Sequence, residues 1–475
     1  LGGQLVAGHG EGAEGSLEML AGLASRGGGW GVSGPGYRPG SERGGQYTGG
    51  LAIGFLGHSA PEPVSTALDP LSTFSLEVDR ASYTHARSLL MSGQLPPPQE
   101  VRPEEFANAF AHLGDPQQPL ALATHPQGGR RAVLAVTVAT QRDERPPVDL
   151  VLAIDVSGSM AGDKLELAKE TAQALLSQLD EDDTVWALTT SSSRGTGPLS
   201  PHSPDLAAWI GALQAYGGSP LGRTMATGVR AANPERDPER LLHLVLISDG
   251  HANSEWANLD RGVHSSLPEG AGLTLVGVGQ AFSQETMEAI ALSGAGSTWF
   301  VGDTSDAQDL AQAFPSLLVP VEDPKVQVEF EPDVVSTWRL IGYGNRGLSD
   351  GESQGQSVMG GSLGQGSTAV ALYELELTGH RGQVATARWR GDGVERDLGA
   401  VHSRERMRWS RAPESLRVQL TAATLAEVLS RPEAQQDPLL ALLPTWTEGP
   451  HELDTLVDQV RRIEPVEIHA AEALP

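Results

Sequence analysis

The sequence predicts an α/β protein built around a doubly wound, mostly parallel sheet, flanked by an antiparallel β-sandwich and followed by C-terminal helices. Two observations predict the sheet. Apolar runs alternate with amphipathic helical segments between 148 and 320, and two of these runs end in a carboxylate, Asp155 and Asp249. The third observation is a change to a period of two after residue 320, which is typical of half-buried antiparallel strands.

The first 68 residues are dominated by glycine. Twenty of the chain's 57 glycines lie within the first 60 positions, among few bulky or β-branched side chains. Because such a segment buries too little apolar surface to offset the entropy of ordering it, we expect residues 1–68 to form a flexible spacer with one short helix at 17–23. The alternative is a segment that orders on a partner, anchored by Trp30, Tyr37 and Tyr47.

Residues 69–147 form the second predicted region. We expect a strand at 74–78 and a helix at 79–91, which ends before the run of three prolines at 96–98. This proline run is predicted to be a rigid connector. A further alternating stretch at 131–138 leads into the central sheet.

Residues 148–320 are predicted to form the central domain. The helical segment at 164–179 carries its leucines and alanines on one face, so it is expected to pack on a sheet. Strands joined by such helices need right-handed crossovers, and ligands bind such sheets at the carboxyl ends of the strands. The expected strands are 150–154, 184–190, 241–247, 273–278 and 298–301, and the other helices are 205–213, 224–232, 284–292 and 305–314.

A cation site is predicted where the first of these strands ends. The buried run 150–154 is followed by Asp155, Ser157 and Ser159. These side chains offer only hard oxygen ligands from one loop, which suits Mg²⁺, Mn²⁺ or Ca²⁺ and does not suit zinc. Asp249 would face Asp155 if the two strands are neighbours. The simpler alternative is a turn in which Asp and Ser cap the next helix.

The Asp-x-Ser-x-Ser pattern at 155–159 resembles the metal-ion-dependent adhesion site of von Willebrand factor type A (VWA) domains. Long, ordered stretches elsewhere resemble a bacterial family of secreted or lipoprotein VWA proteins, the YfbK-like family. This resemblance covers about residues 71–430 and implies a VWA domain at 148–320, preceded by a VWA-associated region. The stretches that carry it are 72–83, 93–98, 101–106, 338–346 and 367–374.

The resemblance implies a third loop of the cation site, after the helix at 205–213. Many VWA domains have Gly-Gly-Thr at this point, and this chain has Gly-Gly-Ser at 217–219. Ser219 is therefore the positional match, and the glycines would let the backbone approach the ion. Thr224 is the alternative, because it is the one threonine of this loop.

The resemblance also implies the roles of these residues. Ser157, Ser159 and Ser219 would coordinate the ion directly, whereas Asp155 and Asp249 would bind through water or at longer range. Mg²⁺ is the expected ion, with Mn²⁺ or Ca²⁺ as alternatives, and one open position would accept a carboxylate from a partner.

The C-terminal part is predicted to be a β-rich domain at 321–412 and a helical tail at 413–475. We expect the β-rich domain to pair with segment 118–140 in one sandwich into which the VWA domain is inserted; two separate β domains are the alternative. Its expected strands are 325–330, 336–341, 368–376 and 384–390, and the tail helices are 414–430 and 451–463.

Composition narrows the functional classes. A chain of 475 residues is expected to hold two or three domains. Its net charge of −27 argues against nucleic-acid binding, and the absence of cysteine excludes disulfides, thiolate catalysis and cysteine-ligated zinc. No apolar run reaches 18 residues, so no bilayer span is expected. A start at Leu1 is what removal of a signal or lipid-anchor segment would leave, and a trimmed sequence would look the same.

The first hypothesis is a non-enzymatic, extracytoplasmic binding protein, in the cell envelope, at the cell surface or secreted. It would use its divalent cation to recognise an acidic group on a protein partner, another copy of itself included. The second hypothesis is a structural subunit of a surface assembly that associates through the VWA domain. Metal-assisted hydrolysis is the least favoured, because no general base accompanies the ion.

Overall fold

The computed structural model describes the chain in blocks, and the helices and strands that it describes belong to one compact unit, Glu42–Pro475. The described residues are 62–76, 79–141, 144–190, 195–218, 237, 239–250, 271–279, 296–321, 323–343, 363–431, 434–447 and 452–463.

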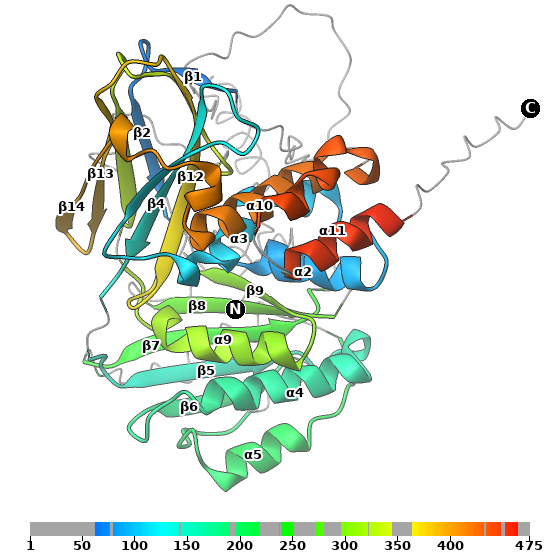
Figure 1. Cartoon of the computed structure of the whole chain (residues 1–475). Helices are drawn as coiled ribbons and strands as arrows, with labels where there is room; N and C mark the ends of the chain where they lie inside the picture. The colour runs from blue at the N-terminus through cyan, green and yellow to red at the C-terminus, as the bar shows by residue number, and fades with distance from the viewer. Residues whose placement is uncertain are drawn as a thin grey trace, which may run out of the picture. The chain divides into compact units, whose positions relative to one another are not determined.

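A sheet of five parallel strands occupies the middle of the sequence (Figure 1). Its strands follow the order β6-β5-β7-β8-β9. Every residue of β5 is buried, which explains why its sequence is almost continuously apolar. The winding reverses at β5, because β6 and β7 lie on opposite sides of it. The strands are β5 Val148–Ile154, β6 Thr184–Thr189, β7 Leu241–Ser248, β8 Gly272–Val278 and β9 Ser297–Val301.

Helices α4 (Asp163–Leu176) and α9 (Thr304–Leu317) lie beside each other across one face of this sheet, as Figure 1 shows. Helix α5 (Pro204–Gly211) packs against α4. One apolar core joins these helices to the strands, and it includes Leu175 of α4 and Phe314 of α9. The leucine face seen in the sequence of α4 is therefore the face that it buries.

Two antiparallel sheets form a sandwich around a single core. One has the order β1-β11-β12-β4-β3 and the other β14-β13-β10-β2. Phe330 of β10 stacks on Trp338 of β11, with ring centroids 5.5 Å apart, and meets Tyr373 of β12 edge-on. The strands are β1 Val64–Ser65, β2 Leu71–Ser75, β3 Leu120–Thr124, β4 Arg131–Ala139, β10 Lys325–Phe330, β11 Val335–Leu340, β12 Thr368–Leu377, β13 Gln383–Gly391 and β14 Val394–His402.

The parallel-sheet domain is inserted into this sandwich. The chain leaves the sandwich at the end of β4 and returns to it at the start of β10. These two strands belong to different sheets, and β4 pairs with β12 from beyond the insertion over its whole length. The sandwich therefore cannot be completed until the chain on both sides of the insertion has been made.

A helical layer covers the outer face of the antiparallel sheet β1-β11-β12-β4-β3. Helices α3 (Pro103–Ala109) and α10 (Glu414–Leu429) pack on it through an apolar core that includes Phe106 and Leu420. Arg339 of β11 joins this layer to the sheet through a buried ion pair with Glu427 of α10.

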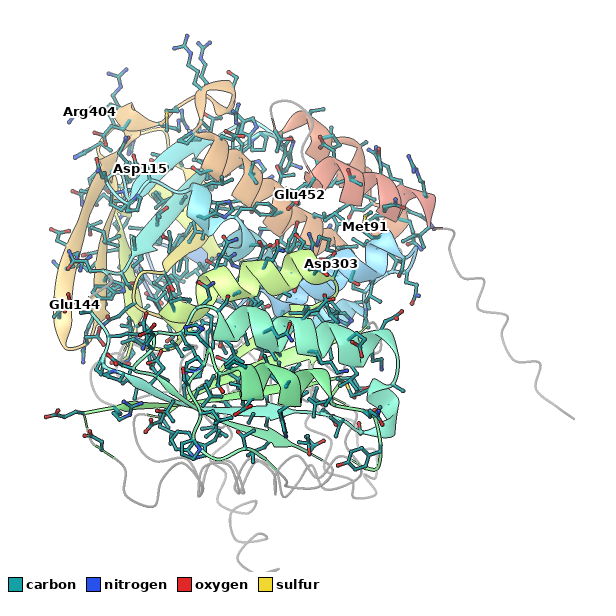
Figure 2. All side chains as sticks on the ribbon, turned by 90° about the horizontal axis from the view of Figure 1, so that it is seen from below. Met91, Asp115, Glu144, Asp303, Arg404 and Glu452 are labelled. Carbon is teal, nitrogen blue, oxygen red and sulfur yellow. The ribbon has the colours of Figure 1, made fainter. Side chains whose placement is uncertain are left out.

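Helix α2 (Ala81–Met91) connects the helical layer to the parallel sheet. Its Tyr83 hydroxyl donates to Glu452 Oε1 at 2.6 Å. Glu452, labelled in Figure 2, is the first residue of α11 (Glu452–Arg462). On the side of the parallel sheet, the ring of His85 packs against the ring of Phe300 in β9, and the two ring centroids are 4.7 Å apart.

The predicted fold class is confirmed, and most of the expected strands and helices are present. The strand expected at 74–78 is shifted, because β2 runs from Leu71 to Ser75 and pairs along β10. Helix α3 and strand β14 were not predicted. The expected helices at 17–23, 224–232 and 284–292, and most of the glycine-rich segment 1–68, lie outside the described residues.

Candidate metal centre

Asp155 lies at the carboxyl end of β5, where the winding of the sheet reverses, and it is fully buried. Three strand ends hold its carboxylate. Oδ1 accepts hydrogen bonds from the Ser157 amide at 2.9 Å and from the Thr190 hydroxyl, beyond β6, at 2.8 Å. Oδ2 accepts from the hydroxyl of Ser248, the last residue of β7, at 2.6 Å. With both oxygens engaged by the protein, Asp155 suits a role that shapes the loop and acts on an ion through water.

Ser157 and Ser159 bring two hydroxyl oxygens together in the loop that follows Asp155. Their Oγ atoms are 3.0 Å apart, and Ser157 is buried while Ser159 is exposed. Neighbouring ligands of an octahedral ion with bonds of about 2.1 Å lie about 3.0 Å apart, so this spacing suits two ligands of a Mg²⁺-sized ion. The spacing is also an ordinary hydrogen-bond distance. The pair lies in the loop that follows β5, with Ser159 at the surface.

A second loop, after α5, lies against the first. The Tyr216 amide donates to Val156 O at 2.6 Å, and the Gly158 amide donates to Gly217 O at 3.2 Å. Gly217 has φ +78, a conformation that favours glycine, so the Gly-Gly turn is what allows this close approach. The structure describes this loop as far as Gly218; Ser219 and Thr224 lie outside the described residues.

Asp249 supplies the second carboxylate, directly after β7, and its side chain is fully buried. Because Ile154 and Ile247 are opposite each other in neighbouring strands, Asp155 is level with Ser248 and Asp249 follows one residue beyond. The ammonium group of Lys164, in the first turn of α4, lies 2.9 Å from Asp249 Oδ2. The structure thus brings loops 155–159, 216–218 and 248–250 to one edge of the sheet.

The donor set fits a hard divalent cation. Carboxylates and hydroxyls gathered here are oxygen ligands, which suit Mg²⁺, Mn²⁺ or Ca²⁺. No cluster of three or more His, Cys, Asp or Glu side chains that could hold a metal occurs among the residues described.

Sequence reasoning missed three residues that shape this centre. Thr190 and Ser248 fix the carboxylate of Asp155, and Lys164 pairs with Asp249. The signal available for the first two was a hydroxyl residue at the end of each strand beside β5, which becomes informative only once the strand order is known. Lys164 gave no such signal, because a lysine in an amphipathic helix usually faces solvent.

Three family models match the chain. The model of the von Willebrand factor type A domain matches residues 149–313. Residues 149–313 are a VWA domain. The model described as the C-terminal part of uncharacterized protein YfbK matches 316–436, and one described as von Willebrand factor matches 57–127. The resemblance to YfbK-like VWA proteins is therefore confirmed.

Two curated relatives carry no described activity. Uncharacterized protein YfbK of Escherichia coli (strain K12) is 29% identical over 395 residues, which cover 77% of this VWA protein and 68% of that relative. Uncharacterized protein sll0103 of Synechocystis sp. is 29% identical over 189 residues, and the match spans 38% of this chain and 44% of that relative.

Among solved structures, a von Willebrand factor type A protein from Catenulispora acidiphila is similar with a TM-score of 0.39 and 17% identity, over 65% of this chain and 76% of that one. The pilus adhesin SpaC from Lactobacillus rhamnosus GG is similar with a TM-score of 0.32 and 12% identity, over 61% of this chain and 48% of that one.

VWA domains mediate protein–protein interactions and generally bind a divalent cation at the adhesion site that this centre resembles. In the described part of the chain, none of the helices combines the length and the apolar character needed to cross a bilayer.

Proposed function

We propose that this VWA protein is a non-enzymatic, extracytoplasmic binding protein that recognises an acidic group on a protein partner through a divalent cation, with Mg²⁺ as the expected ion. The observation that carries the proposal is the hydroxyl pair of Ser157 and Ser159. Their oxygens are 3.0 Å apart in the loop that follows the buried Asp155 at the end of β5.

Each residue of the centre has a distinct part in this function. Ser157 and Ser159 would hold the ion, with Ser219, or Thr224 in its place, as the third hydroxyl. Asp155 and Asp249 supply the negative charge that offsets the cost of dehydrating a divalent cation. The bound ion supplies a Lewis-acidic position to which a carboxylate oxygen of the partner binds.

The surroundings of the centre support binding rather than catalysis. Among the described residues, two hydroxyls and a backbone amide donate to Asp155, and the ammonium group of Lys164 pairs with Asp249. None of these accepts a proton readily at neutral pH, which a general base for metal-assisted hydrolysis must do.

Calorimetric titration of the full chain with Mg²⁺ tests the cation site. Ser159→Ala removes an exposed hydroxyl that is hydrogen-bonded to Ser157, so it is expected to weaken Mg²⁺ binding about tenfold or more and to leave the melting temperature nearly unchanged. Ser177→Ala, at the other end of α4, is the control and should bind Mg²⁺ as the wild type does. Equal affinities in all three proteins, or no binding of Mg²⁺, Mn²⁺ or Ca²⁺ by the wild type, would refute the site.

A second experiment tests recognition of the partner. The full chain is immobilised in Mg²⁺, exposed to envelope and secreted proteins, and eluted with EDTA. A partner that elutes with EDTA, and that fails to bind the Ser159→Ala protein, supports the proposal. A partner that stays bound in EDTA argues against recognition through the ion, and a partner that is another copy of this chain identifies self-association.

A further inference from the structure

Lys164 brings a positive charge into the cation site. Its Nζ lies 2.9 Å from Oδ2 of Asp249, whose side chain is fully buried, while 27% of the lysine side chain is exposed. Lys164 sits in the first turn of α4, where the helix dipole disfavours a cation. The ion pair with Asp249 offsets that disadvantage, so the lysine is held in place by the site rather than by its own helix.

The glycine at the end of β8 fixes the path of this lysine. Gly279 follows the strand with φ +88, and a Cβ there would lie 2.9 Å from both Cδ and Cε of Lys164. The aliphatic part of the lysine therefore runs directly over the backbone of Gly279. Three elements thus position the ammonium group: α4 carries it, the end of β8 supports it, and Asp249 binds it.

The charges at the site show what this lysine changes. Among the described side chains of the site, Asp155 and Asp249 carry two negative charges, and Lys164 reduces their sum to one. A divalent ion then leaves the occupied site with a net charge of +1, whereas without the lysine the occupied site would be neutral. A positive charge near the ion repels it and attracts an anion, and both effects are strong at the edge of a protein interior.

We propose that Lys164 is a specificity-determining residue of the cation site, which lowers the affinity for the ion and raises the affinity of the ion-bound site for a carboxylate. This inference rests on the proposed divalent-cation site. It gives the site a preference for acidic partners over neutral oxygen ligands, since a carboxylate neutralises the remaining charge and a neutral ligand does not.

The test compares four full-length proteins: wild type, Lys164→Met, Lys164→Arg and Lys169→Met. Lys169 lies on the same helix and pairs with the exposed Glu166, so it controls for loss of a lysine from α4. In calorimetric titrations Lys164→Met is expected to bind Mg²⁺ about tenfold more tightly than the wild type. Lys164→Arg and Lys169→Met should stay within about twofold of the wild type, because both keep the charge at the site.

The second measurement uses acetate as the simplest carboxylate. Each protein is loaded with Mn²⁺, and acetate is titrated while water-proton relaxation reports displacement of water from the ion. Acetate is expected to bind the Lys164→Met protein several-fold more weakly than the wild type, and the Lys169→Met protein equally well.

The outcomes separate this inference from the proposed function. If the wild type binds Mg²⁺ and a folded Lys164→Met protein binds it with equal or lower affinity, the role of Lys164 is refuted while the site stands. If the Arg and Met variants change the affinity equally, charge is not the cause and the inference is also refuted. If the wild type binds none of Mg²⁺, Mn²⁺ and Ca²⁺, the proposed function fails. Circular dichroism establishes folding, and Lys164→Gln replaces the Met variant if the latter does not fold.

Discussion

The hydroxyl of Ser248 donates a 2.6 Å hydrogen bond to Oδ2 of Asp155, and so ties the end of β7 to the end of β5. Ser248 is itself fully buried, and it also accepts from the amide of Gly250 at 3.1 Å. This one hydroxyl therefore orients the first carboxylate of the site and shapes the turn that carries the second.

Replacing Ser248 by alanine is expected to weaken Mg²⁺ binding about tenfold, in the range found for residues that orient metal ligands. It should also lower the free energy of unfolding by about 1–3 kcal/mol, because the carboxylate loses a buried donor. Ser75→Ala is the control, since it loses a buried serine hydrogen bond, to Pro324 O, within the sandwich. Ser75→Ala should affect stability similarly and leave the Mg²⁺ affinity unchanged; an equal loss of affinity in both variants would contradict the role of Ser248.

Asp155→Asn should abolish measurable Mg²⁺ binding. The amide removes the negative charge, and its NH₂ group faces hydroxyl and amide donors that the carboxylate now satisfies. Asp155→Ala should be less stable than Asp155→Asn, because it removes the acceptor of three buried hydrogen bonds. Asp149→Asn controls for both, because Asp149 lies at the other end of β5 and pairs with Arg240. Calorimetry that showed wild-type affinity in Asp155→Asn would exclude this carboxylate from the site.

His243 of β7 should make the stability of the VWA domain depend on pH. Burial lowers the pKa of its imidazole from 6.5 to about 3. The unfolded chain therefore binds a proton that the folded one does not between these values, so the stabilisation is complete above pH 6.5 and is lost as the pH falls towards 3. The expected slope is about 1.4 kcal/mol per pH unit.

The measurement for His243 is the free energy of unfolding between pH 4 and 7. His243→Gln should remove this part of the slope, although it will also perturb the packing against Gly272, where a Cβ would lie 2.2 Å from the imidazole Nδ1. The exposed His380→Gln should keep the wild-type slope. A His243→Gln protein with an unchanged slope would show that the pH dependence arises elsewhere.

Arg339 should be essential for attachment of α10 to the sandwich. Its guanidinium pairs with Glu427 of α10 and lies 2.9 Å from Glu374 of β12, and both Arg339 and Glu427 are largely buried. Arg339→Met leaves two carboxylates without the guanidinium that they share. We expect it to lower the free energy of unfolding by about 3–5 kcal/mol.

The control for Arg339→Met is Arg388→Met, which removes an exposed ion pair with Glu395 at 3.9 Å. It should lower the free energy of unfolding by less than about 1 kcal/mol. Thermal unfolding of the full chain measures both. We expect Arg339→Met to lower stability without changing the Mg²⁺ affinity, because this ion-pair network lies outside the cation site. Similar melting temperatures for the two variants would contradict the predicted role of Arg339 in attaching α10.

The sequence was informative where side chains follow a local period. The run 150–154 predicted β5, and the leucine face at 164–179 predicted α4, because burial on one or both faces leaves a direct record in the order of apolar residues. Helix α3 was missed because it is seven residues long, and β14 because its side chains are mostly exposed.

The candidate centre was predictable only in part, because some of its contacts join residues that are far apart in the sequence. Asp155, Ser157 and Ser159 occur together in one loop, so their pattern was visible in the sequence. Thr190 and Ser248 reach Asp155 from neighbouring strands, 35 and 93 positions away. Their part depends on strand order, which hydrophobic periodicity does not contain. The placement of Ser219 and Thr224 stays a prediction.

The insertion of the VWA domain between β4 and β10 has a mechanical consequence. A tensile load on this domain would enter the sandwich through two connections at once and divide between its two sheets. Strand β4 could slide free only by breaking its ladder with β12 along nine residue pairs. A domain tethered at both ends in this way resists extraction by shear, whereas one attached by a single linker would transmit the whole load to one strand.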